Sequence, residues 1–66
     1  MTLAKAIVMY RAKRNISMKE FAALCGVTMQ TIYNIEAVGQ KPSRVTRAKI
    51  EMVLGDEYEL DKEDEE

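Results

Sequence analysis

Two helix-start signals, at Ser17 and Thr28, lie close together in the chain with a glycine between them. Ser17 and Glu20 form a capping-box pattern, in which the hydroxyl and the carboxylate each accept a hydrogen bond from an otherwise unpaired backbone amide. Gly26 is expected to end the first helix, because the residue after a helix often needs a positive φ that glycine tolerates. Thr28 then caps the next helix. The chain is therefore predicted to form two short helices joined by a tight turn.

The apolar residues of this pair have the spacing that two crossed helices need, and the second helix is predicted over residues 29–37. Successive residues are about 100° apart around a helix, which assigns each side chain to a face. The residues expected to face inward are Phe21, Leu24 and Cys25 in the first helix and Ile32 and Ile35 in the second. The residues expected on the opposite face of the second helix are Gln30, Tyr33, Asn34 and Ala37. A face of amides and a phenol is unusual for a helix that is merely solvated.

Two further helices are predicted on either side of this pair. One covers about residues 2–13, with an apolar stripe of Leu3, Ala6, Ile7 and Tyr10, and Ile16 is expected to be buried in the turn that follows. The other is capped by Ser43 and ends near Leu54, and its inner side is expected to contain Val45, Ala48 and Met52, with Ile50 or Val53 as further candidates. The sequence thus predicts a compact all-α domain of four to five helices over residues 1–55.

The composition excludes several classes of site. The 66 residues suffice for one domain, and they include no His and only one Cys, Cys25. This excludes a disulfide framework, a zinc site of the usual Cys/His kind and catalysis by imidazole. No nucleophile–base pair, metal-ligand set or phosphate-binding glycine loop is present, so we expect no enzyme, no metal and no cofactor. No apolar run approaches the ~18 residues of a membrane span, and a cytoplasmic protein is expected.

The net charge of −1 conceals two parts of opposite charge. Residues 1–55 carry nine Lys or Arg and three acids, whereas residues 56–66 carry one Lys and eight acids. The basic body suggests a polyanionic partner. The acidic tail over residues 56–66 is expected to be mobile and solvated. Its only large apolar residues, Tyr58 and Leu60, could fold back on the body or meet a second subunit.

With these features the chain resembles the phage-repressor and Cro type of helix-turn-helix, the XRE family. The resemblance covers about residues 3–55 and is carried by Arg11, Ser17, Phe21, Ala22, Gly26, Val27, Thr28, Ile32, Ile35, Glu36, Gly39, Pro42, Ser43, Thr46, Lys49, Ile50, Leu54 and Gly55. It implies a lambda-repressor-like fold and a transcriptional regulator that binds double-stranded DNA sequence-specifically. Within that family, a small repressor of a phage or mobile element, acting in a bacterial or phage-infected cell, is the reading that we favour.

The resemblance places the recognition helix at residues 29–37. Gln and Asn can form bidentate hydrogen bonds to adenine, and Thr and Met can contact a thymine methyl. The implied base-reading residues are Thr28, Met29, Gln30 and Asn34. The implied backbone or auxiliary contacts are Ser17, Met18, Thr31, Tyr33, Lys41 and Arg44, and Arg11 with Glu36 is the implied structural ion pair. Two features depart from the family: Met18 stands where many members have a Gln, and the acidic tail replaces the usual fifth helix.

The expected partners are DNA and a second copy of the chain, with no membrane and no small-molecule ligand. A single module buries only about 600–1,000 Å² on DNA, so a homodimer on a two-fold operator is expected. The fourth helix and Tyr58 with Leu60 are the candidate dimer surfaces. Two alternatives remain open. The same fold could serve as a protein-interaction module, an antirepressor or assembly partner that does not read DNA. The acidic tail, for its part, could compete with DNA for the basic body.

Overall fold

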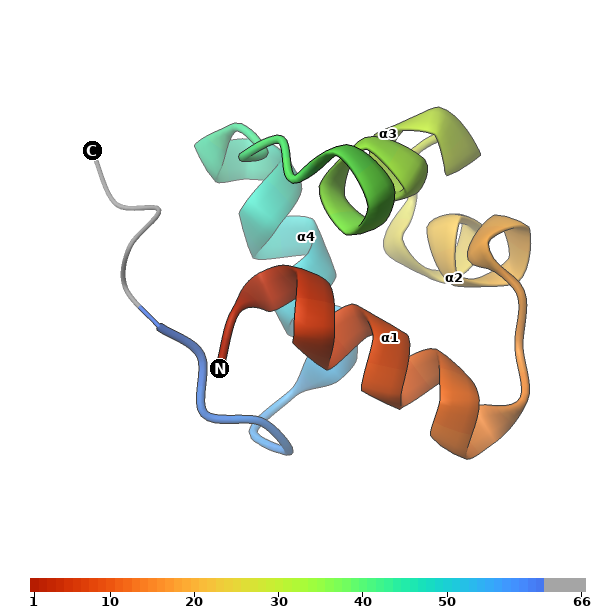
Figure 1. The fold of residues 1–66 in the computed structure, drawn as a ribbon, viewed down its shortest axis with the longest axis vertical. Coiled ribbons are helices and arrows are strands. Elements are labelled where there is room, and N and C mark those ends of the chain that lie inside the picture. The colour runs from red at the N-terminus through yellow and green to blue at the C-terminus, as the bar shows by residue number, and fades with distance from the viewer. Residues whose placement is uncertain (62–66) are drawn as a thin grey trace.

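The structure is a computed structural model, and it describes residues 1–61. Over these residues the elements are α1 (Leu3–Arg14), α2 (Met18–Cys25), α3 (Met29–Tyr33), the π-helical segment η1 (Asn34–Val38) and α4 (Arg44–Leu54) (Figure 1). No strand occurs in this part of the chain. The all-α prediction is confirmed, and the predicted helix over residues 29–37 is divided into an α-helical and a π-helical turn.

Each α-helix begins at a hydroxyl residue that caps it, and three of these caps, Ser17, Thr28 and Ser43, are as the sequence predicts. Thr2, Ser17, Thr28 and Ser43 each accept a hydrogen bond from the backbone amide three residues later. At α2 the capping box is complete, because Ser17 N also donates to Glu20 Oε1 at 2.7 Å. Gly26 ends α2 in the left-handed region, with φ of 75°, which sends the chain directly into α3. The tight turn between the two helices is therefore set by local residues.

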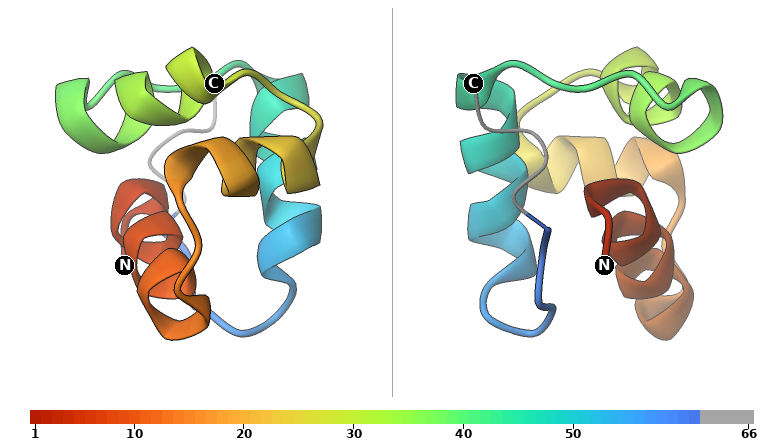
Figure 2. Two further views of the ribbon diagram at one scale, coloured as in Figure 1. Left: turned by 90° about the vertical axis from the view of Figure 1, so that its right-hand side faces the viewer. Right: turned by 60° about the vertical axis from the view of Figure 1, so that its left-hand side comes forward.

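The core lies where α1, α2 and α4 meet beneath α3 and η1, as the two side views show (Figure 2). Phe21 is fully buried at its centre, and its ring meets that of Tyr10 edge to face, with 5.3 Å between the centroids. Edge-to-face pairs of this kind add to the stabilisation that burial alone provides. The buried residues are Leu3, Ala6, Ile7, Tyr10, Phe21, Ala22, Cys25, Ile32, Ile35, Ile50 and Leu54.

The predicted inner face of α2 is wrong at one position. Leu24 is 57% exposed, whereas Phe21, Ala22 and Cys25 are buried. The buried face is centred between Phe21 and Ala22, and at 100° per residue Leu24 lies more than 100° from that centre. The spacing of three residues from Phe21 to Leu24 therefore gave a misleading stripe. Ile16, predicted to be buried in the preceding turn, is only half-buried.

The predicted inner face of α4 is also wrong. Val45, Ala48 and Met52 are exposed, with Met52 at 83%, and the buried residues are Ile50 and Leu54. The aliphatic part of Arg47 completes the inner side, since this side chain is only 14% exposed. The helix carries two apolar stripes, and the β-branched Ile50 with Leu54 faces the core.

The chain after α4 folds back between α4 and the start of α1 (Figure 2, right). We refer to residues 56–61 as the acidic strap. Tyr58 and Leu60 are half-buried and pack against the core, and Asp61 N donates to the Met1 carbonyl oxygen at 2.8 Å. Glu57 pairs with Lys13 at 2.6 Å and with Arg14 at 3.2 Å. The first part of the predicted tail thus packs on the body, and residues 62–66 of that tail lie outside the described residues.

Candidate nucleic-acid interface

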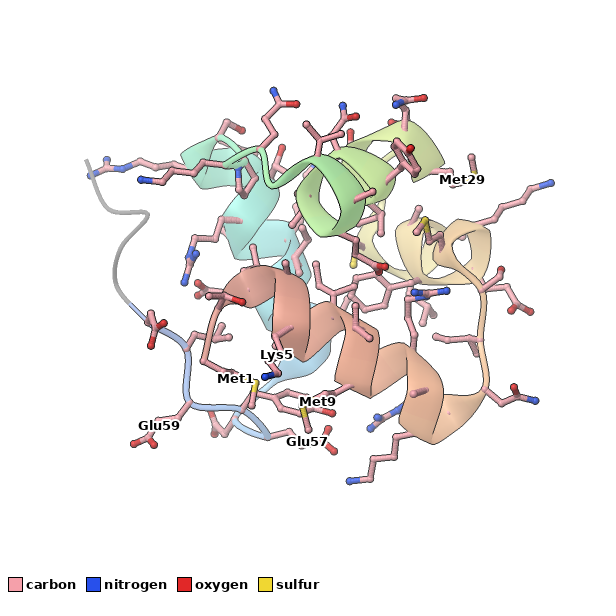
Figure 3. All side chains as sticks on the ribbon, in the orientation of Figure 1. Met1, Lys5, Met9, Met29, Glu57 and Glu59 are labelled. Carbon is pink, nitrogen blue, oxygen red and sulfur yellow. The ribbon has the colours of Figure 1, made fainter. Side chains whose placement is uncertain are left out.

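The outward side of α3 presents polar side chains that the rest of the described chain leaves open. Met29, Gln30 and Tyr33 are exposed, and Asn34 is half-buried at the first residue of η1. Gln30 Nε2 donates to Asn34 Oδ1 at 3.0 Å, so the two amides form one unit on this surface. Met29 lies at the outer edge of the molecule (Figure 3). The residues predicted to read bases are therefore grouped on one accessible side.

The hydrogen bond between the two amides orients Gln30. The Nε2 atom carries two hydrogens, and the bond to Asn34 uses one of them. Gln30 therefore keeps one N–H donor beside its carbonyl acceptor, which is the pair that matches N7 and N6 of adenine in the major groove. Because the bond also restricts the rotamers of Gln30, this side chain would lose less conformational entropy on binding a base than a freely rotating glutamine.

The hydroxyl groups of Thr28 and Thr31 contact each other at the start of α3. The Thr28 hydroxyl accepts the Thr31 backbone N–H at 3.2 Å, and the two hydroxyl oxygens lie 3.0 Å apart. These contacts fix the start of α3, where backbone amides point out of the helix. With its hydroxyl engaged in the cap, Thr28 has its methyl group as the part suited to a thymine methyl.

The loop before α4 lies beside α3 and η1, on the same side of the molecule (Figure 1). Together α3 and η1 contain the predicted recognition helix, and we refer to them as the recognition segment. A surface hollow of about 190 Å³ separates this segment from the loop and is lined by both, including Asn34, Lys41 and Ser43. Lys41 and Arg44 are exposed. The structure thus places Lys41 beside the base-reading candidate Asn34, and Arg44 follows at the start of α4. Ser17 lies elsewhere, exposed at the start of α2, and the neighbouring Met18 is half-buried against the core.

The ion pair between Arg11 and Glu36 is present and spans α1 and η1. Arg11 Nη1 lies 2.9 Å from one carboxylate oxygen of Glu36 and 3.0 Å from the other. The side chains are 22% and 7% exposed. Glu36 is thus enclosed by the protein and serves to fix η1 on α1, which in turn sets the position of the recognition segment.

Residues 7–57 match the model of the helix-turn-helix family, the XRE type that includes phage repressors and Cro. The match covers well over half of the chain. The chain belongs to this family. No curated protein and no solved structure matches it. The family consists of DNA-binding regulators that are generally non-enzymatic, and the chain is a DNA-binding helix-turn-helix regulator.

Three further observations on the described residues concern metal ions, membranes and the single thiol. Over residues 1–61 no three His, Cys, Asp or Glu side chains gather closely enough to hold a metal ion. None of the described helices has the length and apolar character needed to cross a membrane. Burial raises the pKa of the Cys25 thiol to about 11, so this thiol stays neutral near pH 7.

The structure adds one positioning contact that the sequence did not indicate, and the backbone of Gln40 makes it. Gln40 is exposed and lines the hollow beside Lys41, and its backbone amide donates to the Asn34 carbonyl oxygen at 3.0 Å. This bond fastens the loop to the end of the recognition segment. The only sequence signal was its position between Gly39 and Lys41, because the contact depends on how η1 ends.

Proposed function

We propose that this regulator reads the major groove of double-stranded DNA with the outward side of α3 and Asn34. Gln30 and Asn34 form hydrogen bonds to base edges, and Thr28 and Met29 contact thymine methyl groups. The observation that carries the proposal is the hydrogen-bonded pair of the exposed Gln30 and the half-buried Asn34, with Gln30 Nε2 lying 3.0 Å from Asn34 Oδ1. Two side-chain amides that orient each other by a hydrogen bond suit the recognition of base edges better than a face that only contacts water.

The phosphate contacts come from both sides of this reading surface. Lys41 and Arg44 supply charge from the loop and from the start of α4, and their binding releases counterions. Thr31 and Tyr33 supply hydroxyl groups beside the base-reading residues. At α2 the contact comes from the Ser17 hydroxyl and from the Met18 backbone amide, because the Met18 side chain is half-buried.

The regulator acts as a small repressor of the phage or mobile-element Cro type, bound to a two-fold operator as a homodimer. One module of this size buries too little DNA surface for strong specificity, and two modules double it. The two half-sites then lie about 34 Å apart or a multiple of that distance. Repression needs only that the bound dimer occupies DNA that the transcription machinery requires.

Selection of bound sites from random duplex oligonucleotides tests the reading. We expect an enriched two-fold motif, and Gln30→Ala should cost about 1–3 kcal/mol on that site and relax base choice at one position of each half. Gln40→Ala is the matched control, since it removes an exposed amide of the same chemistry from the loop. It should leave the base preference unchanged.

Two results would contradict the proposal. One is the absence of any preferred sequence, and the other is a Gln30→Ala variant that selects the same motif with the same affinity. No site preference combined with a stable complex with another regulator would favour the alternative, a protein-interaction module of the same fold.

A further inference from the structure

The outer face of α4 is an apolar surface that no other described element covers. Val45, Ala48 and Met52 follow one another at helical spacing along this face. Val45 is 65% exposed and Met52 is 83% exposed. Ala48, which is small and also exposed, lies between them. Three such positions in register on one helix form a stripe of the kind that normally packs against another helix.

The stripe borders a hollow of about 730 Å³ between α4 and the acidic strap. Ala48 and Met52 line it from α4, and Tyr58 and Leu60 line it from the strap. Its rim is charged, with Arg47 and the three acids Glu51, Asp56 and Asp61 among the lining residues. The stripe and the hollow therefore form one continuous surface that joins apolar side chains to a mainly acidic rim.

The charges beside the stripe determine what fits there. Arg44 and Glu51 are seven residues apart, so at 100° per residue they lie on the same flank of α4, at its basic and acidic ends. Glu51 pairs with Arg47 of its own helix, and its side chain is 42% exposed, so its carboxylate can accept a second cation. If a second α4 packs antiparallel about a two-fold axis near Ala48, Arg44 of each copy lies opposite Glu51 of the other. In a parallel two-fold pair, Arg44 would lie level with Arg44 and Glu51 with Glu51 on opposite sides of the interface, so no such pairing would form. The surface is thus self-complementary, as a two-fold interface must be.

We propose that this surface binds a second copy of the chain, with the two α4 helices antiparallel and Ala48 at the crossing. Val45 of each copy packs on Met52 of the other, and Arg44 reaches the acidic rim of the partner's hollow. The small side chain of Ala48 lets the helices approach closely. This inference rests on the homodimer of the proposed function and specifies its interface. Arg44 thereby has a role in the dimer interface, in addition to the phosphate contact proposed above.

Sedimentation of the full chain without DNA, over a dilution series, tests the interface. We expect the wild-type chain to dimerise and Met52→Lys to weaken dimerisation at least about tenfold, because two lysines would be buried across the axis. Leu24→Lys is the matched control, since Leu24 is also exposed and apolar but lies on α2. Circular dichroism should confirm that both variants are folded.

A charge swap tests the antiparallel orientation. Arg44→Glu and Glu51→Lys should each weaken the dimer, because each places like charges opposite one another in both halves. An equimolar mixture of the two variants should restore dimerisation, since opposite charges then meet at both positions. A mixture that stays monomeric while both single variants are weakened would overturn the antiparallel interface.

The remaining outcomes are equally decisive. A wild-type chain that stays monomeric at high micromolar concentration, or a Met52→Lys chain that dimerises normally, would overturn the proposal. Binding to a DNA duplex with a single half-site separates this result from the proposed function. Met52→Lys should bind one half-site as the wild type does and lose only the gain from a two-fold site. Loss of wild-type binding to every duplex would contradict the DNA reading and leave the dimer intact.

Discussion

Replacing Glu36 with glutamine perturbs the ion pair that fixes η1 on α1. Arg11 Nη1 contacts both carboxylate oxygens of Glu36, at 2.9 and 3.0 Å. The Arg11 Nε atom is buried and has no hydrogen-bond partner, so the guanidinium depends on Glu36 for compensation of its charge. Glutamine keeps the shape of the side chain and one acceptor but removes the negative charge. The variant therefore isolates the electrostatic part of the contact.

The magnitude follows from the burial of the pair. Removing one member of a fully buried ion pair costs about 3–5 kcal/mol, because the other charge stays uncompensated. Arg11 is 22% exposed, and water offsets part of this loss, so we expect a cost of about 2–3 kcal/mol. A domain of 66 residues has an unfolding free energy of roughly 3–10 kcal/mol. The melting temperature should therefore fall by about 10–20 °C.

Thermal and urea unfolding followed by circular dichroism measures this effect, and a double-mutant cycle separates the pair from its surroundings. Arg11→Met should cost much less in the Glu36→Gln background than in the wild-type chain, because the charge that it leaves unpaired is then absent. A fall of less than about 4 °C for Glu36→Gln would mean that the pair is worth under about 1 kcal/mol, like an exposed pair. The argument from burial would then be refuted.

Two further predictions concern the turn and the strap. Gly26→Ala should lower the unfolding free energy by about 1–2 kcal/mol, because φ is +75°, a conformation that is strained for alanine. No steric term is added, since a Cβ at this position meets nothing within 4 Å. Urea denaturation measures the change in unfolding free energy, and a much larger loss would show a steric clash. The hydrogen bond from Lys13 lowers the pKa of Glu57 from 4.5 and raises the pKa of Lys13 from 10.5. The strap contact should thus be complete between these values and weaken as pH falls through the lowered pKa of Glu57 or rises through the raised pKa of Lys13. The NMR resonances of the Leu60 methyl groups report whether the strap is in place. If a Glu57→Gln chain kept both the low-pH and the high-pH transition, the Glu57–Lys13 pair could not be their cause.

The elements that sequence could predict are those fixed by neighbouring residues. The caps at Ser17, Thr28 and Ser43 act over three residues, and the left-handed Gly26 acts over one turn, so all of them appear as predicted. The pairing of Arg11 with Glu36 spans 25 residues, and the resemblance to the family supplied it, because no local pattern could. The division of the recognition segment into α3 and η1 had no signal in the sequence.

The faces of α4 could not be decided locally, because the helix carries two apolar stripes. One runs through Val45 and Met52 and the other through Ile50 and Leu54, and only the packing of the whole domain selects the second. The strap has the same difficulty. Glu57 pairs with Lys13 and Arg14, which precede it in the chain by 44 and 43 positions. The acidic composition of the segment does not reveal such distant partners. The composition predicted a solvated tail because it gives the number of acidic residues but not the basic residues that they contact.

The strap pairs part of the acidic charge of a chain of net charge −1 with basic residues of the body. Glu57 lies against Lys13 and Arg14, and the Asp61 carbonyl oxygen accepts a hydrogen bond from Arg47. In Figure 3, Glu57 and Glu59 lie at the opposite end of the molecule from Met29. The longest dimension is 31 Å, which is several times the Debye length of about 8 Å at physiological salt. In the proposed complex, the carboxylates at that end of the strap are thus largely screened from a duplex at α3. They reduce the positive charge at Lys13 and Arg14, so under this proposal phosphates are attracted mainly to the side that carries α3 and η1.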